Sequence, residues 1–195
     1  MNIRLAACAV ALLATGCATL PEAGSAGDWP ARRAALQSLV RWTLDGRMAV
    51  AAGTEGYSGG LSWRQDGAQA EIELRAPMGG RAISIRVEGE AISVSDGRGT
   101  TVDGEDAGRL VAEHLGTTLP VAELRYWLVG VPAPGSPHQE FIGADHRLAS
   151  LDQSGWRVGY IAYRGVGDVV LPSRMEITTE GLRLRLVVAE WRLGP

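Results

Sequence analysis

The sequence predicts a mainly β protein, with antiparallel strands arranged around a two-helix insert. Apolar and polar residues alternate over most of the chain, glycine-containing turns recur at short intervals, and helical spacing is confined to two stretches. The 195 residues include 26 glycines and 6 tryptophans but a single phenylalanine, a composition that favours many turns and a few large aromatic surfaces. A chain of this length can bury one ordinary globular core.

The N-terminus is typical of an exported lipoprotein. Arg4 precedes an apolar run from Leu5 to Ala14, and Thr15-Gly16-Cys17 then supplies small residues that end in a cysteine. Because the run is shorter than the roughly 20 apolar residues of a membrane-spanning helix, we interpret residues 1–16 as a signal peptide. Ala14-Thr15-Gly16-Cys17 resembles a lipobox, with Ala14 where leucine is usual. We therefore predict lipidation of Cys17.

The alternative is an ordinary secreted protein with a stray cysteine, and the cysteine count argues against it. Cys8 lies in the segment to be removed, so the mature chain contains only Cys17 and cannot form an internal disulfide. A lone thiol is a liability in an oxidising periplasm. In bacteria that sort lipoproteins as enterics do, aspartate after the lipidated cysteine causes retention in the inner membrane, whereas this chain has Ala18. We expect a lipid-anchored protein on the periplasmic face of the outer membrane.

The folded domain is expected to begin near Asp28, so that residues 28–195 form a single domain. Residues 17–27 are small and flexible, as suits a tether. Pro30 fits the first turn of a short helix in which Leu36, Leu39 and Val40 recur at helical spacing.

From Trp42 the apolar period changes to two, which predicts half-buried antiparallel strands. The first group of strands carries Trp42 to Val50, Tyr57 to Trp63, Ile72 and Leu74, Ile83 to Val87, and Ile92 and Val94, separated by turns at 52–53, 66–67, 79–80, 88–89 and 96–97. Residues 104–130 return to helical spacing, with one helix ending at Gly116 and a second opening at Pro120. Strands resume at about 138–142, 147–153, 156–163, 171–178 and 182–190, and we expect about eleven in total.

An antiparallel sheet with one apolar face must cover that face, and two short helices cover only part of it. Trp42, Trp63, Trp127 and Trp156 all fall on the apolar phase. Flat aromatic side chains fit both a filled core and a cavity for apolar ligands, so periodicity alone leaves both open.

Composition and motifs argue against nucleic-acid binding and catalysis. The formal net charge is -3, with 19 arginines and no lysine, whereas nucleic-acid binding requires a basic balance. Gly56-Tyr57-Ser58-Gly59-Gly60 matches the G-x-S-x-G of hydrolases, but the residues that follow have strand rather than helix character. The histidines His114, His138 and His146 lack the short helical spacing of a zinc site. We predict no enzyme activity, no metal and no cofactor.

A series of short motifs runs through nearly the whole mature chain. They are Trp42-x-Leu44-x-Gly46-Arg47-Met48-Ala49-Val50, Leu61-x-Trp63-x-Gln65, Pro77-Met78-Gly79, Leu119-Pro120-Val121-x-x-Leu124-x-Tyr126-Trp127-Leu128-x-Gly130, Gly155-Trp156-x-Val158-x-Tyr160, Leu171-Pro172-x-Arg174 and Trp191. In their order, spacing and attachment to a lipoprotein signal, these motifs together resemble the LolB family of outer-membrane lipoprotein receptors.

The resemblance implies an unclosed antiparallel β-barrel of about eleven strands, with short helices that cover an apolar cavity. It also implies a function without catalysis, in which the periplasmic carrier LolA hands over an acylated lipoprotein that the receptor inserts into the outer membrane. In the family a loop, typically Gly-Pro-Leu-Gly, projects an apolar residue that helps insertion. The matching segment is Ala76-Pro77-Met78-Gly79, so Pro77, Met78 and Gly79 are expected to form a membrane-insertion loop.

The expected acyl-chain cavity is lined by apolar-phase residues of the first strands and of the helix after Pro120. The candidates are Trp42, Leu44, Met48, Leu61, Trp63, Ile83, Ile85, Leu124, Trp127 and Leu128. The implied partners are LolA, the acyl chains of client lipoproteins and outer-membrane lipid, and the protein is expected to be a monomer. An alternative from a different class is a structural or scaffolding envelope lipoprotein with a filled barrel and no acyl cargo.

Overall fold

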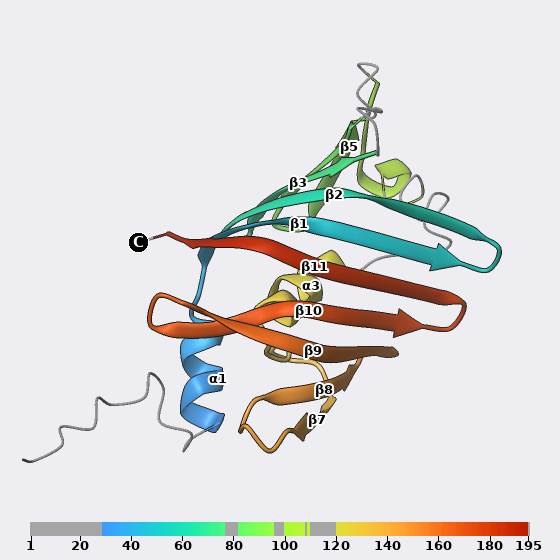
Figure 1. The fold of residues 1–195 in the computed structure, drawn as a ribbon. Coiled ribbons are helices and arrows are strands. Elements are labelled where there is room, and N and C mark those ends of the chain that lie inside the picture. The colour runs from blue at the N-terminus through green and yellow to red at the C-terminus, as the bar shows by residue number, and fades with distance from the viewer. Residues whose placement is uncertain (1–28, 77–81, 96–99, 108, 110–119, 195) are drawn as a thin grey trace, which may run out of the picture.

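The computed structural model describes residues 29–76, 82–95, 100–107, 109 and 120–194 (Figure 1). Several features predicted from the sequence lie outside these residues. They are the signal peptide, Cys17 and the tether, the loop with Pro77, Met78 and Gly79, the turn at 96–97, and most of the first insert helix, which ends at Gly116 in the prediction.

The described chain contains two longer helices and eleven strands. The helices are α1 (Trp29–Gln37) and α3 (Val121–Leu128). The strands are β1 (Arg41–Ala52), β2 (Glu55–Asp66), β3 (Gln69–Arg75), β4 (Ala82–Glu88), β5 (Ala91–Ser95), β6 (Thr101–Asp103), β7 (His138–Ile142), β8 (Leu148–Gln153), β9 (Trp156–Val166), β10 (Val169–Thr179) and β11 (Leu182–Leu193). The ten strands expected from alternation are all present, and β6 is the one that the pattern did not delimit.

All eleven strands form one antiparallel sheet in the order β6-β5-β4-β3-β2-β1-β11-β10-β9-β8-β7. The two edge strands, β6 and β7, do not pair with each other, so the barrel is unclosed, as expected. The sheet curves around α3, which lies on its inner side (Figure 1). Pairing of β1 with β11 joins the two halves of the sheet, which we call the N-terminal half (β1–β6) and the C-terminal half (β7–β11).

The central β1–β11 pair bends at an irregularity between Asp45 and Gly46. Asp45 pairs with Glu190 but Gly46 pairs with Val188, so Ala189 is an extra residue in β11. A Cβ atom on Gly46 would overlap the carbonyl oxygen of Val187, which explains the glycine at this position. Such bulges increase local twist and help a sheet to curve.

Helix α1 is shorter than its apolar spacing suggested. It ends at Gln37, so Leu39 and Val40 lie beyond the helix, and Val40 is 53% exposed. Of the predicted residues Leu36, Leu39 and Val40, Leu36 is the one that lies in the helix, and it is buried. The helix packs beside β7 instead, where Trp29 Nε1 donates to Glu140 at 2.6 Å and Arg33 forms an ion pair with the same carboxylate at 2.9 Å. Tertiary contacts therefore determine where this helix ends.

The inner face of the sheet and one side of α3 form a continuous hydrophobic core. The strands alternate as predicted: in β11, for example, Leu182, Leu184, Leu186 and Val188 are buried while Arg183 and Arg185 are exposed. The hairpin turns at Gly53, Gly67 and Gly89 adopt positive φ angles of 57°, 58° and 63°, which glycine tolerates without strain.

Candidate functional site

The structure brings together all ten residues predicted to line an acyl cavity. Nine belong to the hydrophobic core formed by the inner face and α3, and Ile83 packs against it. Nine have side chains no more than 7% exposed, namely Trp42, Leu44, Met48, Leu61, Trp63, Ile85, Leu124, Trp127 and Leu128, and Ile83 is half-buried. The candidate site is therefore the inner apolar face of the sheet together with α3.

Aromatic rings occupy the middle of this face. The centroid of Trp42 lies 6.0 Å from that of Trp63 and 5.3 Å from that of Trp191, and Trp127 lies 6.3 Å from Trp156. Tilted and edge-on contacts of this kind contribute about 0.5–1.5 kcal/mol each beyond the burial of area. The indole N–H groups of Trp63, Trp127 and Trp191 donate to protein oxygens, as in Trp191, which donates to the carbonyl of Pro172 at 2.8 Å.

Gln153 fastens α3 to the C-terminal half. This side chain is 2% exposed, and its Oε1 accepts hydrogen bonds from Trp127 Nε1 at 2.8 Å and from the backbone N–H of Ala133 at 2.9 Å. Its Nε2 donates to the carbonyls of Ala133 and Ser136. Tyr160, also buried, donates its hydroxyl to the carbonyl of Trp127 at 2.9 Å. The helix is thus positioned by polar contacts as well as by apolar burial.

Gln65 has the corresponding position in the N-terminal half, but its contacts are local. Its Oε1 accepts from Trp63 Nε1 at 2.9 Å, and its Nε2 donates to the carbonyls of Gly67 and Gln69 in the β2–β3 turn. From α3, Arg125 Nη1 donates to the carbonyl of Gly67 at 2.8 Å.

Two buried tyrosines in the C-terminal half are strongly perturbed. Burial raises the pKa of Tyr160 well above its ordinary value, and burial is also the main cause of the raised pKa of Tyr163. The Tyr163 hydroxyl donates to the carbonyl of Leu148 at 2.6 Å. Both phenols are therefore neutral hydrogen-bond donors at neutral pH, and their role is structural.

The two halves of the inner face are packed to different degrees. Among the larger side chains that are essentially inaccessible, the C-terminal half contributes Leu148, Leu151, Val158, Leu171, Met175, Ile177 and Leu186. Within the described strands of the N-terminal half, this group contains only Leu44 and Val94. Tyr57, Leu74, Ile83, Ile92 and Val102 on that half are only partly buried. Tyr163, Val166, Val169 and Leu193 are likewise partly buried on the C-terminal half, so the two halves differ in how many side chains are completely buried.

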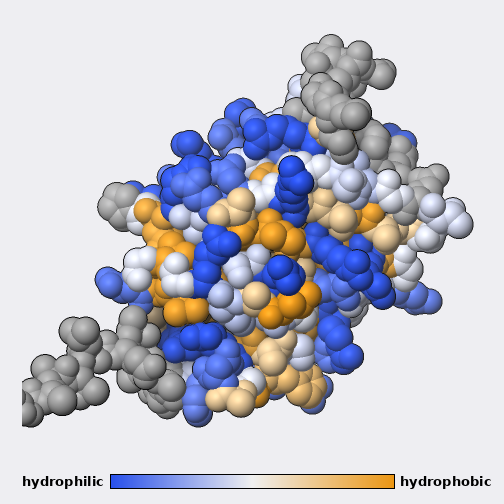
Figure 2. Space-filling model, viewed as in Figure 1, coloured by the Kyte–Doolittle hydropathy of each residue, from blue (hydrophilic) through white to orange (hydrophobic). Residues whose placement is uncertain are grey.

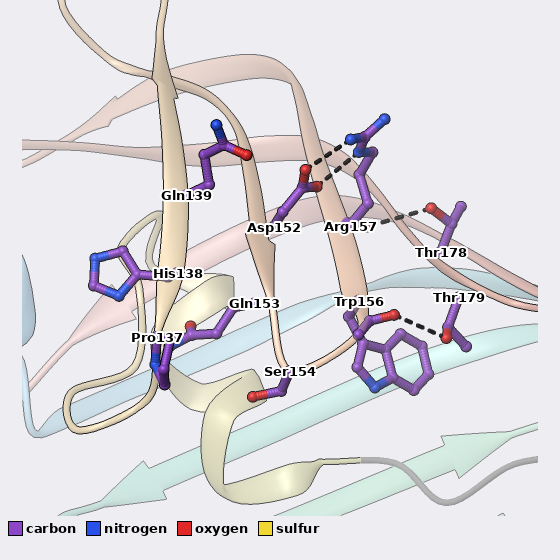
Figure 3. Close-up of a pocket in the computed structure, with 11 residues that line it drawn as sticks. Pro137, His138, Gln139, Asp152, Gln153, Ser154, Trp156, Arg157, Thr178 and Thr179 are labelled. Atoms are coloured by element: carbon purple, nitrogen blue, oxygen red, sulfur yellow. Dashed lines mark hydrogen bonds and ion pairs between the residues drawn. The ribbon is translucent and has the colours of Figure 1, made fainter.

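An open hollow of ≈ 690 Å³, lined by polar side chains together with Trp156, lies at the end of the β8–β9 hairpin (Figure 3). Asp152 and Arg157 face each other across two hydrogen bonds of 2.7 Å there, and Thr178 and Thr179 donate to neighbouring backbone carbonyls. The hydrogen bonds from Arg157 hold the pKa of the Asp152 carboxyl below its usual value. Because these groups already satisfy one another, the hollow is unlike an acyl-chain site.

The hydrolase interpretation of Ser58 is not supported by the local geometry. Gly56 to Gly60 lies inside β2, and Ser58 is exposed in regular register with Ala49 of β1. A nucleophile elbow needs a sharp turn into a helix at this point. His146 has a φ of 56° in the turn between β7 and β8, as its Asp-His context suggested. Among the described residues, no helix is long and apolar enough to cross a bilayer.

An unclosed antiparallel sheet with an apolar inner face and a short helix over it defines a class of protein, the LolA-like fold. A LolA superfamily protein from Nitrosomonas europaea has this fold, with a TM-score of 0.51 at 10% identity over 81% of this chain and 88% of that one. A putative outer membrane lipoprotein-sorting protein domain from Vibrio parahaemolyticus gives 0.53 at 9% identity, over 85% and 90% of the two chains.

Within that class the chain belongs to the LolB family. Residues 40–191 match the family model described as outer membrane lipoprotein LolB. The chain is 33% identical to the outer-membrane lipoprotein LolB of Nitrosococcus oceani, with 94% of each chain covered, and 36% identical to that of Pseudomonas putida, with 94% and 92% covered. The family resemblance seen in the short motifs is thereby confirmed.

Sequence reasoning missed the residues that hold the site in place. Gln65 and Gln153 were not predicted as site residues, although each occupies an inward position of its strand. A polar residue on the apolar phase, close in space to a tryptophan, is a signal that could have found them, because a buried amide must be hydrogen-bonded.

Proposed function

We propose that this protein accepts acylated lipoproteins from the periplasmic carrier LolA and inserts them into the outer membrane. The observation that supports this most is the continuous apolar inner face of an unclosed sheet, on which several side chains are only partly buried. Acyl chains cannot cross water unshielded, since each methylene contributes about 0.8 kcal/mol to burial. Membership of the LolB family supports the same role.

The acyl chains of the cargo are proposed to lie against the N-terminal half. Leu61, Ile83 and Ile85 are proposed to contact the chains, and the half-buried Leu74 and Ile92 to extend this surface towards solvent. The fully buried Leu44 and Trp127 then form its floor. Transfer proceeds downhill if this surface holds the chains more tightly than the carrier and less tightly than the bilayer. An adaptable lining of aromatic and methionine side chains suits such intermediate affinity.

The receptor is proposed to be anchored by acyl chains on Cys17, with residues 17–27 as a flexible tether and 28–195 as the folded domain. Cys17→Ser should abolish incorporation of labelled palmitate and release the protein from the membrane, because the tether makes no part of the core. Uptake of label by the variant, or none by the wild type, would contradict the anchor.

Insertion is proposed to depend on the Pro77-Met78-Gly79 loop, with Met78 as the apolar tip. Met78→Glu would place a charge where hydrocarbon is expected, at a cost of up to about 3 kcal/mol if the tip reaches the bilayer interior. The variant should still accept lipoprotein from LolA but deliver it to liposomes at least tenfold more slowly. Ala91→Glu, at an exposed apolar position in β5, is the control and should deliver at the wild-type rate.

A fluorescent fatty acid tests the cargo itself. We expect it to bind the purified protein and to be displaced by an acylated lipoprotein. If it does not bind, the filled-barrel scaffold becomes the better account of this fold.

A further inference from the structure

The outer face of the central strands is strongly basic, although the whole chain has a net charge of -3. We define the basic face as the outward side chains of β1, β9, β10 and β11. It carries eight arginines (Arg41, Arg47, Arg157, Arg164, Arg174, Arg183, Arg185 and Arg192) and three acidic side chains (Asp45, Glu176 and Glu190). The positive charge is thus concentrated on the side of the sheet that faces away from α3.

The acidic side chains on this face are already shared between arginines. Asp45 lies 2.7 Å from Arg192 and 3.9 Å from Arg75, and Glu176 lies 2.8 Å from Arg185 and 3.7 Å from Arg183. Arg41 and Arg157 also pair with Asp66 of β2 and Asp152 of β8, and the face still keeps an excess of positive charge after these ion pairs are counted.

Two arginines at the centre of the face have no such partner. Arg47 and Arg174 are both in register with Val187, one on each neighbouring strand. Within the described part of the chain, neither forms an ion pair. Val187 is 47% exposed and Ile161, at the irregularity beside Arg174, is 58% exposed. Figure 2 shows this face, where apolar patches lie among strongly hydrophilic side chains.

The outward side chains of β2 to β6 differ in sign. They include the arginines Arg64, Arg75 and Arg86 against the acidic Asp66, Glu71, Glu73, Glu88 and Asp103. An anionic surface would consequently attract the basic face and repel the outer face of β2 to β6, which gives the molecule a preferred orientation.

We propose that the basic face lies on the anionic phospholipid headgroups of the membrane and turns the inner apolar face towards the periplasm. The inference rests on the proposed anchor at Cys17. Twelve residues from Cys17 to Trp29 span at most about 40 Å, close to the diameter of a domain of this size. The bilayer surface is therefore always within reach, and a weak electrostatic contact is sufficient to orient the domain.

Lipid fits the face better than a protein partner does. The large exposed apolar residues on this face are two β-branched side chains, Ile161 and Val187, whereas protein hot spots are enriched in Trp, Tyr and Arg. Long arginine side chains can reach headgroups from a curved surface without shape complementarity. In this orientation the site for incoming cargo is open to the periplasm while the receptor stays at its destination.

The test uses the lipidated protein in vesicles, with a fluorophore on Val187→Cys and headgroup-attached nitroxide as quencher. Ala91→Cys, on β5, is the control position for the label. In vesicles with one quarter phosphatidylglycerol at low salt, the label on Val187→Cys should be quenched and the label on Ala91→Cys should not. Quenching should disappear in neutral vesicles and in 0.5 M salt.

Arg174→Glu, added to the labelled protein, should reduce the ratio of surface-bound to free orientations about 25-fold, because each unit charge near an anionic surface contributes a factor of about five. Arg174→Gln should reduce it about fivefold. Arg86→Glu makes the same charge change on the outer face of β4 and should reduce the ratio of surface-bound to free orientations by no more than twofold.

Equal quenching in neutral vesicles, or equal loss with Arg86→Glu, would overturn the proposal. The proposal would also be wrong if the label on Val187→Cys stayed unquenched with anionic vesicles and became shielded from solvent only when LolA was added, because the face would then bind protein. Flotation with neutral vesicles checks the anchor independently. If the protein does not float with neutral vesicles, the proposed anchor is wrong. The basic face should then still bind anionic vesicles peripherally, and this binding should weaken with salt and with Arg174→Glu. Without such binding, the basic face has no lipid role.

Discussion

Each half of the sheet contains one buried glutamine that accepts an indole N–H, and the two differ in what they connect. Gln65 joins Trp63 to its own hairpin turn, so its partners lie within four residues along the chain. Gln153 joins β8 to Trp127 of α3 and to Ala133 of the following segment, which are 26 and 20 residues away along the chain. The same chemical group thus stabilises local structure in one half and tertiary structure in the other.

This difference indicates which half can yield to a ligand. The C-terminal half is attached to α3 by Gln153 and Tyr160 and is closely packed. The N-terminal half makes a polar contact with α3 at the β2–β3 turn, where Arg125 donates to the carbonyl of Gly67. We infer that α3 and the C-terminal half form a rigid unit and that the N-terminal half moves outward when acyl chains occupy the inner face.

The largest effect should follow from removing Gln153. Gln153→Ala leaves the Trp127 indole N–H and both backbone groups of Ala133 buried without partners, at about 1–3 kcal/mol each. We expect a loss of about 3–5 kcal/mol in the free energy of unfolding, measured by urea denaturation.

Gln65→Ala is the matched variant in the other half and should cost about 1–2 kcal/mol, because its turn carbonyls can bind water instead. The exposed Gln139→Ala of β7 is the control, within about 0.5 kcal/mol of wild type. Equal losses for Gln153→Ala and Gln65→Ala would remove the proposed asymmetry between the halves.

The sequence predicted the strands well because alternation reports directly which side of a strand is buried, as β11 illustrates. It could not predict the end of α1, since Leu39 and Val40 continue the apolar spacing while contacts of Trp29 and Arg33 with Glu140, over 100 residues away, position the helix. It also missed the contact of Gln153 with Trp127 for the same reason. Long-range hydrogen bonds leave no periodic signal.

A smaller effect is expected at the accessible edge of the N-terminal half. Ile83 is half-buried on the inner face, so Ile83→Glu can turn its carboxylate towards solvent and should leave the fold intact. It should nevertheless weaken binding of a fluorescent fatty acid at least tenfold, or about 1.4 kcal/mol, because a charge then lies beside the acyl chain.

Ile161→Glu provides the control on the opposite face of the sheet, where the side chain is 58% exposed. It introduces the same charge and should bind the fatty acid as wild type does. If Ile83→Glu also binds normally while remaining folded, acyl chains do not occupy the N-terminal half.

The smallest effect at neutral pH concerns the phenols of the C-terminal half, and it grows in alkali. Burial raises the pKa of Tyr160 and of Tyr163, so the folded state keeps their protons when the unfolded chain, with phenol pKa values of about 10, begins to lose them. A pKa that is raised in the folded state stabilises the fold. This contribution is fully present below pH 10, and it is lost as the pH rises towards the pKa of the folded state. Unfolding free energy should therefore be flat up to about pH 9.5 and then fall, by at most about 1.4 kcal/mol per pH unit for each tyrosine.

Tyr163→Phe isolates one of these phenols. At pH 7 it should cost about 1 kcal/mol through loss of the hydrogen bond to the carbonyl of Leu148. Above pH 10 its stability should fall half as steeply as that of wild type, since Tyr160 still titrates. Tyr57→Phe, in the N-terminal half, removes a phenol that is half-buried and should reduce the slope less than Tyr163→Phe does. Urea denaturation at pH 7, 9, 10.5 and 11 measures both the stability at neutral pH and its loss per pH unit in alkali. If Tyr57→Phe reduces this loss as much as Tyr163→Phe does, the alkaline transition does not begin in the C-terminal half.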